Sequence, residues 1–83
     1  MDENQNAQGI SIYPNPANGK FEISSSQFPL KEIEIYNLYG EKIYQQTVNR
    51  KQETVNLNEA SGIYFLKLTT EHGTIAKKII LQK

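Results

Sequence analysis

Apolar residues recur at every second position in several short segments of this chain, and this spacing limits the folds open to it. Ile33 and Ile35 alternate with charged residues, and Leu66 and Leu68 repeat the same spacing. Successive side chains of a β-strand point to opposite faces, so the pattern predicts strands with one buried face. The glutamates of residues 31–37 would suit a helix by propensity, but isoleucines at a spacing of two favour a strand.

Turn-forming residues separate these segments. Pro14 and Pro16 each lack a backbone donor and end the first strand, and Asn18-Gly19 can then reverse the chain. Strands are predicted at residues 10–13, 19–25, 31–37, 42–48, 52–57, 63–70 and 74–81. The fold class is therefore all-β, a seven-stranded antiparallel Ig-like β-sandwich. A β-barrel is the alternative, which the unequal strand lengths make less suitable.

The composition restricts the partners. Nine Lys and Arg balance nine Asp and Glu, so the chain lacks the positive charge that nucleic acid or an anionic membrane would attract. Residues 1–9 are polar and predict a linker, which leaves one domain at residues 10–83. Met1 precedes acidic and amide residues, the opposite of a signal peptide. We therefore expect the chain to be a domain taken from a longer protein.

Catalytic and metal-binding residues are scarce. His72 is the single histidine and falls in a predicted hairpin turn, where a solvated side chain is the ordinary outcome. Glu32 and Glu34 alternate with isoleucines and are expected on a solvent face, without the enclosure that separates the pKa values of paired acids. The chain has no cysteine, and its one aspartate is Asp2. The sequence predicts no enzyme, no cofactor and no metal site.

The tyrosines suggest a second hypothesis. Tyr13, Tyr36, Tyr39, Tyr44 and Tyr64 could form a carbohydrate-binding face, because tyrosine stacks on sugars and hydrogen-bonds to them. The ordinary interpretation is that tyrosine favours strands. Tyr64 alternates with leucines and is expected in the core, and Tyr36 and Tyr44 could pair across a hairpin. A carbohydrate-binding or structural Ig-like module remains the alternative function.

Three motifs and a short basic segment, in a fixed order, make the sequence more specific. They are Tyr-Pro-Asn-Pro-Ala-Asn-Gly-Lys-Phe at 13–21, Ile-Tyr-Asn-Leu-Tyr-Gly-Glu-Lys-Ile at 35–43 and Ser-Gly-Ile-Tyr-Phe-Leu-Lys-Leu at 61–68, followed by Lys-Lys-Ile-Ile at 77–80. In this order and spacing they resemble the type A C-terminal sorting domains of proteins exported by the type IX secretion system. The resemblance covers residues 10–83.

The resemblance implies a function and a set of partners. Such domains follow a cargo domain and lead it from the periplasm through an outer-membrane translocon. A sortase-like cysteine protease then cuts before the domain and joins the cargo to the cell surface; otherwise the protein is secreted. The scissile bond would lie within or just before residues 2–9. The sorting domain itself would neither bind nucleic acid nor insert into the membrane.

The resemblance also assigns residues to recognition. Those that match the family motifs are Pro14, Asn15, Pro16, Asn37, Gly40, Gly62, Tyr64 and Lys78. Most could be structural, because the prolines shape a strand end, the glycines can supply positive φ and Tyr64 fills the core. Lys78 adds little to packing and is expected to be exposed, and Glu53 is expected on the surface as well. Unpaired strand edges are predicted to dock the translocon and to allow self-association.

Overall fold

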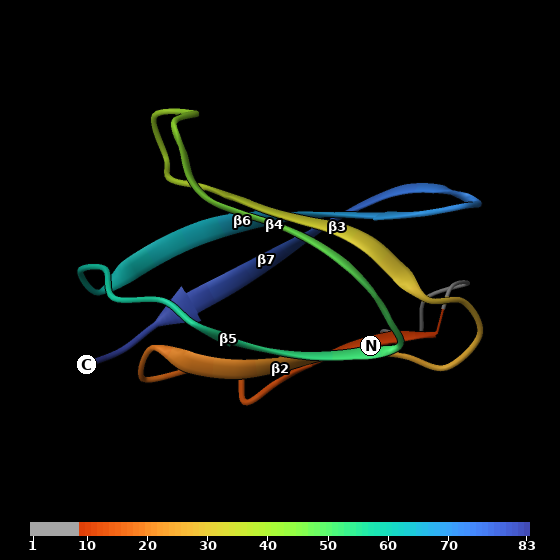
Figure 1. Cartoon of the computed structure of the whole chain (residues 1–83). Helices are drawn as coiled ribbons and strands as arrows, with labels where there is room; N and C mark the ends of the chain where they lie inside the picture. The colour runs from red at the N-terminus through yellow and green to blue at the C-terminus, as the bar shows by residue number, and fades with distance from the viewer. Residues whose placement is uncertain (1–8) are drawn as a thin grey trace.

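Two antiparallel sheets stack face to face in the computed structural model, which describes residues 9–83 (Figure 1). The smaller sheet has the order β1-β2-β5, from β1 (Ile10–Tyr13), β2 (Lys20–Ser25) and β5 (Gln52–Asn56). The larger sheet has the order β4-β3-β6-β7, from β3 (Leu30–Tyr36), β4 (Lys42–Arg50), β6 (Gly62–Thr70) and β7 (Gly73–Leu81). The predicted seven-stranded sandwich is confirmed, and within the described residues the 58–62 loop contains no helical turn.

The core follows from the period-two alternation. Phe21 and Ile23 in β2 point towards Ile33 and Ile35 in β3, and all four side chains are essentially inaccessible to solvent. The remaining buried apolar residues come from β1, β3, β5, β6 and β7 and from the loops beside them: Ile10, Ala17, Leu30, Val55, Leu57, Tyr64, Leu66, Leu68, Ile79 and Leu81. Both sheets therefore bury one face and leave the other to solvent.

The two ends of the sandwich hold different parts of the chain. At one end the carbonyl of Gly9 accepts a hydrogen bond from the amide of Ser26. At the other end Ala17 bridges to Leu81, and Leu81 pairs with Gly62. The C-terminus lies at this second end, at the left of Figure 1. Residues 1–8 of the predicted linker lie outside the described residues.

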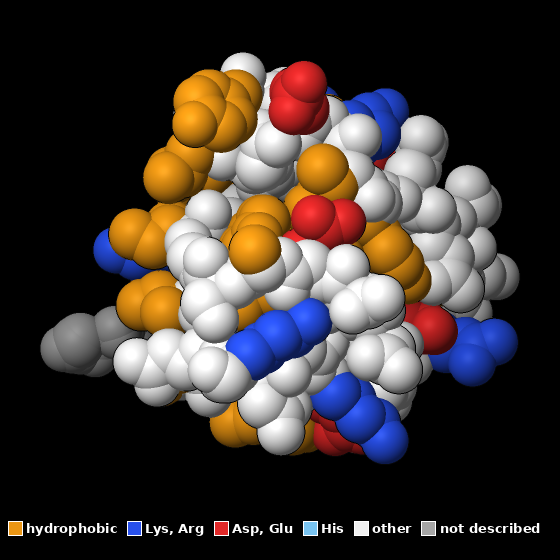
Figure 2. Space-filling model, turned by 90° about the vertical axis from the view of Figure 1, so that its left-hand side faces the viewer, with side chains coloured by type: hydrophobic (Ala, Val, Ile, Leu, Met, Phe, Trp, Pro, Cys, Tyr) orange, Lys and Arg blue, Asp and Glu red, His pale blue; other side chains and the backbone are white. Residues whose placement is uncertain are grey.

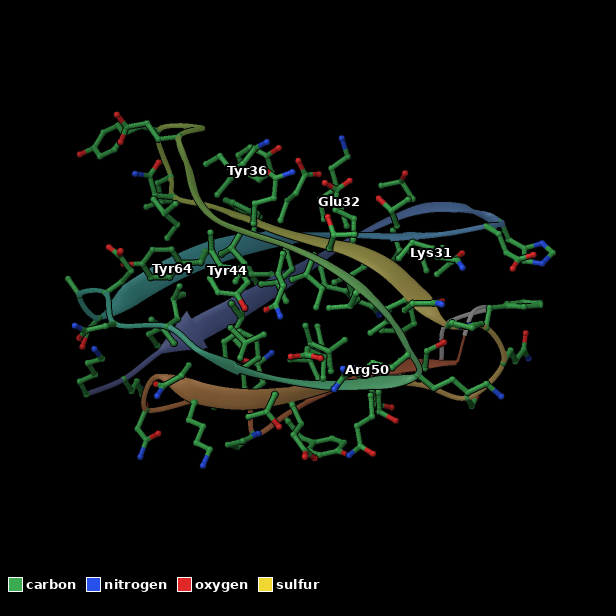
Figure 3. The ribbon with its side chains drawn as sticks, viewed as in Figure 1. Lys31, Glu32, Tyr36, Tyr44, Arg50 and Tyr64 are labelled. Atoms are coloured by element: carbon green, nitrogen blue, oxygen red, sulfur yellow. The ribbon has the colours of Figure 1, made fainter. Side chains whose placement is uncertain are left out.

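The tyrosines are distributed over the molecule, and one predicted pairing is wrong. A register shift between Ile35 and Tyr36 sets Lys42 opposite Tyr36 and sets Tyr44 opposite Ile35. Tyr36 therefore points out of the larger sheet, while Tyr44 lies between the sheets (Figure 3). Tyr64 is buried in the core, as predicted.

Glu53 does not lie on the surface as expected. It pairs with Ile23 across β2 and β5, so both side chains point inward, and the Glu53 side chain is only 13% exposed. Its Oε1 lies 3.5 Å from Nε of Arg50. The alternation that places Val55 in the core applies equally to Glu53, two residues earlier.

Candidate functional site

The proline motif lies along the outer edge of the last strand. Asn15 Nδ2 donates to the carbonyl of Lys78 at 3.2 Å, and Asn15 Oδ1 accepts from the amide of Ile80 at 3.1 Å. The amide of Ala17 then donates to the carbonyl of Ile80 at 2.8 Å, and the carbonyl of Ala17 accepts from Gln82 at 2.7 Å. The segment thus pairs with the end of β7 as a short neighbouring strand would. Pro14 and Pro16 themselves are exposed.

Asn37 organises the turn between β3 and β4. Its Oδ1 accepts hydrogen bonds from the amides of Tyr39 and Glu41, at 2.9 and 3.0 Å. Gly40 closes the turn with a positive φ of 82°, a conformation that residues other than glycine disfavour. The turn holds Leu38 and Tyr39 away from the sheet, and they are 63% and 89% exposed. The hydrogen bonds of Asn37 in the second motif therefore fix the turn that exposes the side chains of Leu38 and Tyr39.

The third motif joins the core to the C-terminus. The buried Tyr64 donates its hydroxyl to the carbonyl of Ala60 at 2.7 Å, which satisfies its one polar atom. Ser61 Oγ accepts from the amide of Lys83 at 3.0 Å. Gly62 and Tyr64 also line a surface depression together with Asn37 and Leu38. The second and third motifs therefore lie side by side.

Lys78 is exposed on the outer face of the larger sheet, as predicted, opposite Phe65 of β6. Within residues 9–83 its ammonium group makes no ion pair or hydrogen bond, and its carbonyl is the one that receives Asn15. We call residues 14–17, 37–40, 61–64 and Lys78 the motif end. Figure 2 looks at the side of the molecule where these segments lie, and hydrophobic side chains are exposed in the upper half of that view.

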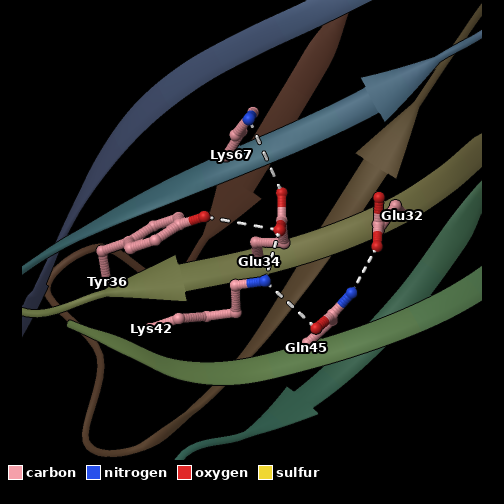
Figure 4. A network of polar contacts seen from close by, with 6 residues as sticks. All are labelled: Glu32, Glu34, Tyr36, Lys42, Gln45 and Lys67. Carbon is pink, nitrogen blue, oxygen red and sulfur yellow. Dashed lines mark hydrogen bonds and ion pairs between the residues drawn. The ribbon is translucent and has the colours of Figure 1, made fainter. Parts of the chain in front are cut away.

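A charged network on the same outer face was missed by sequence reasoning. Glu34 was expected to be solvated, but its side chain is only 11% exposed because Lys42 and Lys67 lie over it from the neighbouring strands. Lys42 Nζ is 3.0 Å from Glu34 Oε2, and Tyr36 donates to the same oxygen at 3.3 Å (Figure 4). The cross-strand partners β4 and β6 create this arrangement.

The contacts of Glu34 shift two pKa values. The hydrogen bond from Lys42 holds the pKa of the Glu34 carboxyl below its ordinary value of 4.5, and partial burial opposes this shift. The same hydrogen bond raises the pKa of Lys42 above 10.5. Each partner thus favours the charged form of the other, as in an ion pair that contributes to folding. A general acid would instead need a raised carboxyl pKa, near the working pH.

Phe65 was also missed. It is 42% exposed, because it lies between the inward-facing Tyr64 and Leu66 in β6 and therefore points outward. The strand pattern could have located it, because the alternation that buries Tyr64 and Leu66 places Phe65 between them on the outer face.

His72 is the remaining residue that the sequence analysis considered for catalysis. The His72 ring is exposed in the turn between β6 and β7, as expected, and its centroid also lies 3.8 Å from that of Phe28. Among residues 9–83, His, Asp and Glu form no group of three that could hold a metal ion. No helix in the described part of the chain has the length and apolar character to cross a membrane.

The structure therefore defines a small β-sandwich whose motif segments lie around one end. Comparison with protein families gives the particular group: residues 11–82 match the secretion system C-terminal sorting domain. The chain belongs to this family and is a type IX secretion C-terminal sorting domain.

A similar protein places such a domain in a larger one. Ulvan lyase NLR42 of Nonlabens ulvanivorans is 27% identical over 75 residues, which are 88% of this chain. The chain spans 14% of the length of that relative. In this relative, sequence related to the present domain forms a small part of a much longer protein.

Proposed function

We propose that the motif end is the address that the outer-membrane translocon reads. The observation that carries this proposal is convergence: segments 14–17, 37–40 and 61–64 are far apart in the sequence and lie around one end of the sandwich with Lys78. Within the motif end, the side chains of Leu38, Tyr39 and Lys78 are exposed and can be contacted by a receptor. A folded surface of this kind can act on unrelated cargo, because it depends on no residue outside the domain.

The role is delivery and not catalysis. Pro14, Asn15, Pro16, Asn37, Gly40, Gly62, Tyr64 and Lys78 act either as contacts or as supports for contacts. The supporting class is Asn15, Asn37, Gly40, Gly62 and Tyr64, whose hydrogen bonds or backbone angles hold the exposed groups. The exposed class is Lys78 with the two prolines.

The cargo precedes the domain and travels from the periplasm to the cell surface or the medium. A sortase-like cysteine protease then cuts within or just before residues 2–9. This position is compatible with the fold, because β1 begins at Ile10 and a cut before it leaves β1 and the strands that follow intact. The sorting domain would therefore remain folded after it is cut from the cargo.

A carbohydrate-binding role has less support. Tyr13 lies on β1 of the smaller sheet, Tyr36 on the outer face of the larger sheet and Tyr39 in a turn, while Tyr44 and Tyr64 point inward. Sugar stacking needs several rings on one face. Retention of the isolated domain on polysaccharide resins would favour this alternative.

A reporter fusion tests the proposed function. The domain is placed behind a reporter that has its own signal peptide, in a host with the type IX system. We expect the reporter outside the cell. The reporter without the domain should stay in the periplasm and serves as the control. Equal distribution of the two proteins would show that this chain does not sort cargo.

A further inference from the structure

The outer edge of β7 is covered along only half of its length. In an antiparallel strand the N–H and C=O of one residue point to the same side, and the side alternates from residue to residue. Ile80 bonds outward to Asn15 and Ala17, so Lys78, Ala76 and Thr74 also point their amides outward. Within the described chain nothing pairs with the backbone of Ala76 or Thr74 on that side. We call residues 74–78 the free edge.

An apolar groove opens onto the free edge. It runs over the outer face of the larger sheet and is lined by Tyr36, Leu38, Phe65, Thr74, Ala76 and the stem of Lys67. The small side chain of Ala76 leaves the groove open at the strand edge. A side chain from a strand added beside β7 would point into this groove, because side chains of neighbouring strands align on each face.

The charges on this strand have one sign. Lys77 and Lys78 are the charged residues of β7, and neither makes an ion pair within residues 9–83. Glu34, on the outer face of the same sheet, is already paired with Lys42 and Lys67. The free edge therefore presents backbone donors, an apolar groove and uncompensated positive charge together.

We propose that the free edge binds an extended, acidic segment of a partner protein, which adds to the larger sheet as a fifth strand. Its backbone bonds to Thr74, Ala76 and Lys78, and its apolar side chain opposite Ala76 enters the groove on the outer face. Its carboxylates lie opposite Lys78 on that face and opposite Lys77 on the inner face. The assignment of this partner to the export machinery rests on the proposed function. The binding geometry does not.

A second copy of the domain is a poorer occupant. Pairing of two β7 edges would bring both lysines of each copy together, and like charges across strands are destabilising. Lysine on an edge strand is a common means by which proteins avoid such pairing. The same lysines attract a segment of opposite charge.

Binding is tested with labelled peptides and the folded domain. The probe is a six-residue peptide with glutamates at the positions opposite Lys77 and Lys78 and a valine opposite Ala76, and the control replaces the glutamates by lysine. We expect fluorescence polarisation to show binding of the acidic peptide alone. Hydrogen exchange at the amides of Thr74 and Ala76 should slow when it binds. Equal binding of the two peptides, or unchanged exchange at both amides, would overturn the proposal.

A proline at the edge separates backbone pairing from side-chain contact. Ala76→Pro removes an outward donor and no bond within the sheet, a position where proline is tolerated. It should weaken the acidic peptide at least about tenfold, whereas Ala76→Ser, which keeps the N–H, should change binding less than about twofold. If A76P does not fold, Thr74→Pro takes its place. Peptide binding that survives a folded proline variant would overturn strand addition.

The charge contribution has its own variant. Lys78→Gln should weaken the acidic peptide by about two- to fivefold at low salt, and Lys51→Gln, on an exposed turn far from β7, should not. Concentration-dependent dimerisation through β7 that displaces the peptide would overturn the choice of occupant.

Export measurements distinguish the two proposals. A wild-type domain that binds the peptide but fails to move the reporter would refute the sorting address and leave the peptide site intact. An A76P domain that no longer binds peptide but exports normally would overturn the assignment of the partner to the export machinery.

Discussion

The side-chain oxygen of Asn15 accepts a hydrogen bond from the backbone amide of Ile80, 65 residues later in the chain. The side-chain nitrogen of Asn15 donates to the carbonyl of Lys78. An amide side chain has the same donor and acceptor as a peptide group, so Asn15 imitates one residue of a neighbouring strand. The first motif therefore covers the strand edge that bears Lys78.

Replacing Asn15 tests this cover. Asn15→Ala should lower the free energy of unfolding by about 1 kcal/mol, because two partly exposed hydrogen bonds are lost to water. Hydrogen exchange at the amide of Ile80 should accelerate. Asn18→Ala is the control, since Asn18 is exposed in the same loop and its side chain makes no hydrogen bond within residues 9–83. Unchanged exchange at Ile80 would contradict the proposed protection of its amide by Asn15.

Gly40 is predicted to matter for its backbone and not for space. A Cβ built there would meet no atom within 4 Å, but φ is 82°. Gly40→Ala should therefore cost about 1 kcal/mol in unfolding experiments, and Gly40→Asn clearly less, because asparagine tolerates positive φ. Equal losses for the two variants would mean that something other than φ constrains this position.

Acid should weaken the domain through Glu34. Its pKa is below 4.5 in the folded protein, so its contribution to stability is present above that value and is lost as the pH falls through the folded pKa. Lys42, whose pKa is raised above 10.5, contributes below that value and loses its contribution as the pH rises through the folded pKa.

Glu34→Gln should consequently melt below wild type at neutral pH, and the difference should shrink as the pH falls to about 3. Thermal melts over this range measure it. Glu71→Gln, in the exposed turn between β6 and β7, is the control. A difference that stays constant with pH would show that the charge of Glu34 contributes nothing.

Lys78→Ala separates recognition from folding. The side chain is exposed and makes no polar contact within residues 9–83, so the variant should melt within a few degrees of wild type. If Lys78 belongs to the address, reporter export should nevertheless fall. Lys51→Ala, a lysine exposed between β4 and β5, is the matched control and should export normally. Normal export of both variants would remove Lys78 from the address.

Folding should be independent of metal. The chain has no cysteine, and residues 9–83 contain no cluster of metal-ligating side chains. Thermal melts with and without a strong chelator should superimpose. A fall of several degrees on chelation would indicate a missed site.

Most of the fold was predictable because the local pattern carries it. Alternation at Ile33 and Ile35 locates a strand and its buried face without any knowledge of neighbours. Strand boundaries agree to within two residues, as at β4, which ends at Arg50 where Val48 was expected. The alternation also applied to Glu53, but a glutamate was assumed to be exposed.

The errors arise where two strands meet. The register shift after Ile35 moves Tyr44 to the inner face, and no signal within residues 42–48 indicates it. The coverage of Glu34 depends on side chains from β4 and β6, which a single strand pattern does not contain. The site residues were found through their resemblance to a family. Their grouping around one end depends on the pairing of Gly62 and Ala17 with Leu81, which only the three-dimensional structure supplies.

The chain enters the sandwich at Gly9, at the end opposite the one where Ala17 meets Leu81. The body of the sandwich therefore separates the point where the described chain begins from the motif end. A bulky, folded passenger attached before Gly9 would therefore not block the residues that a receptor must touch. One sandwich can in this way serve passengers of very different size without any adjustment of its own sequence.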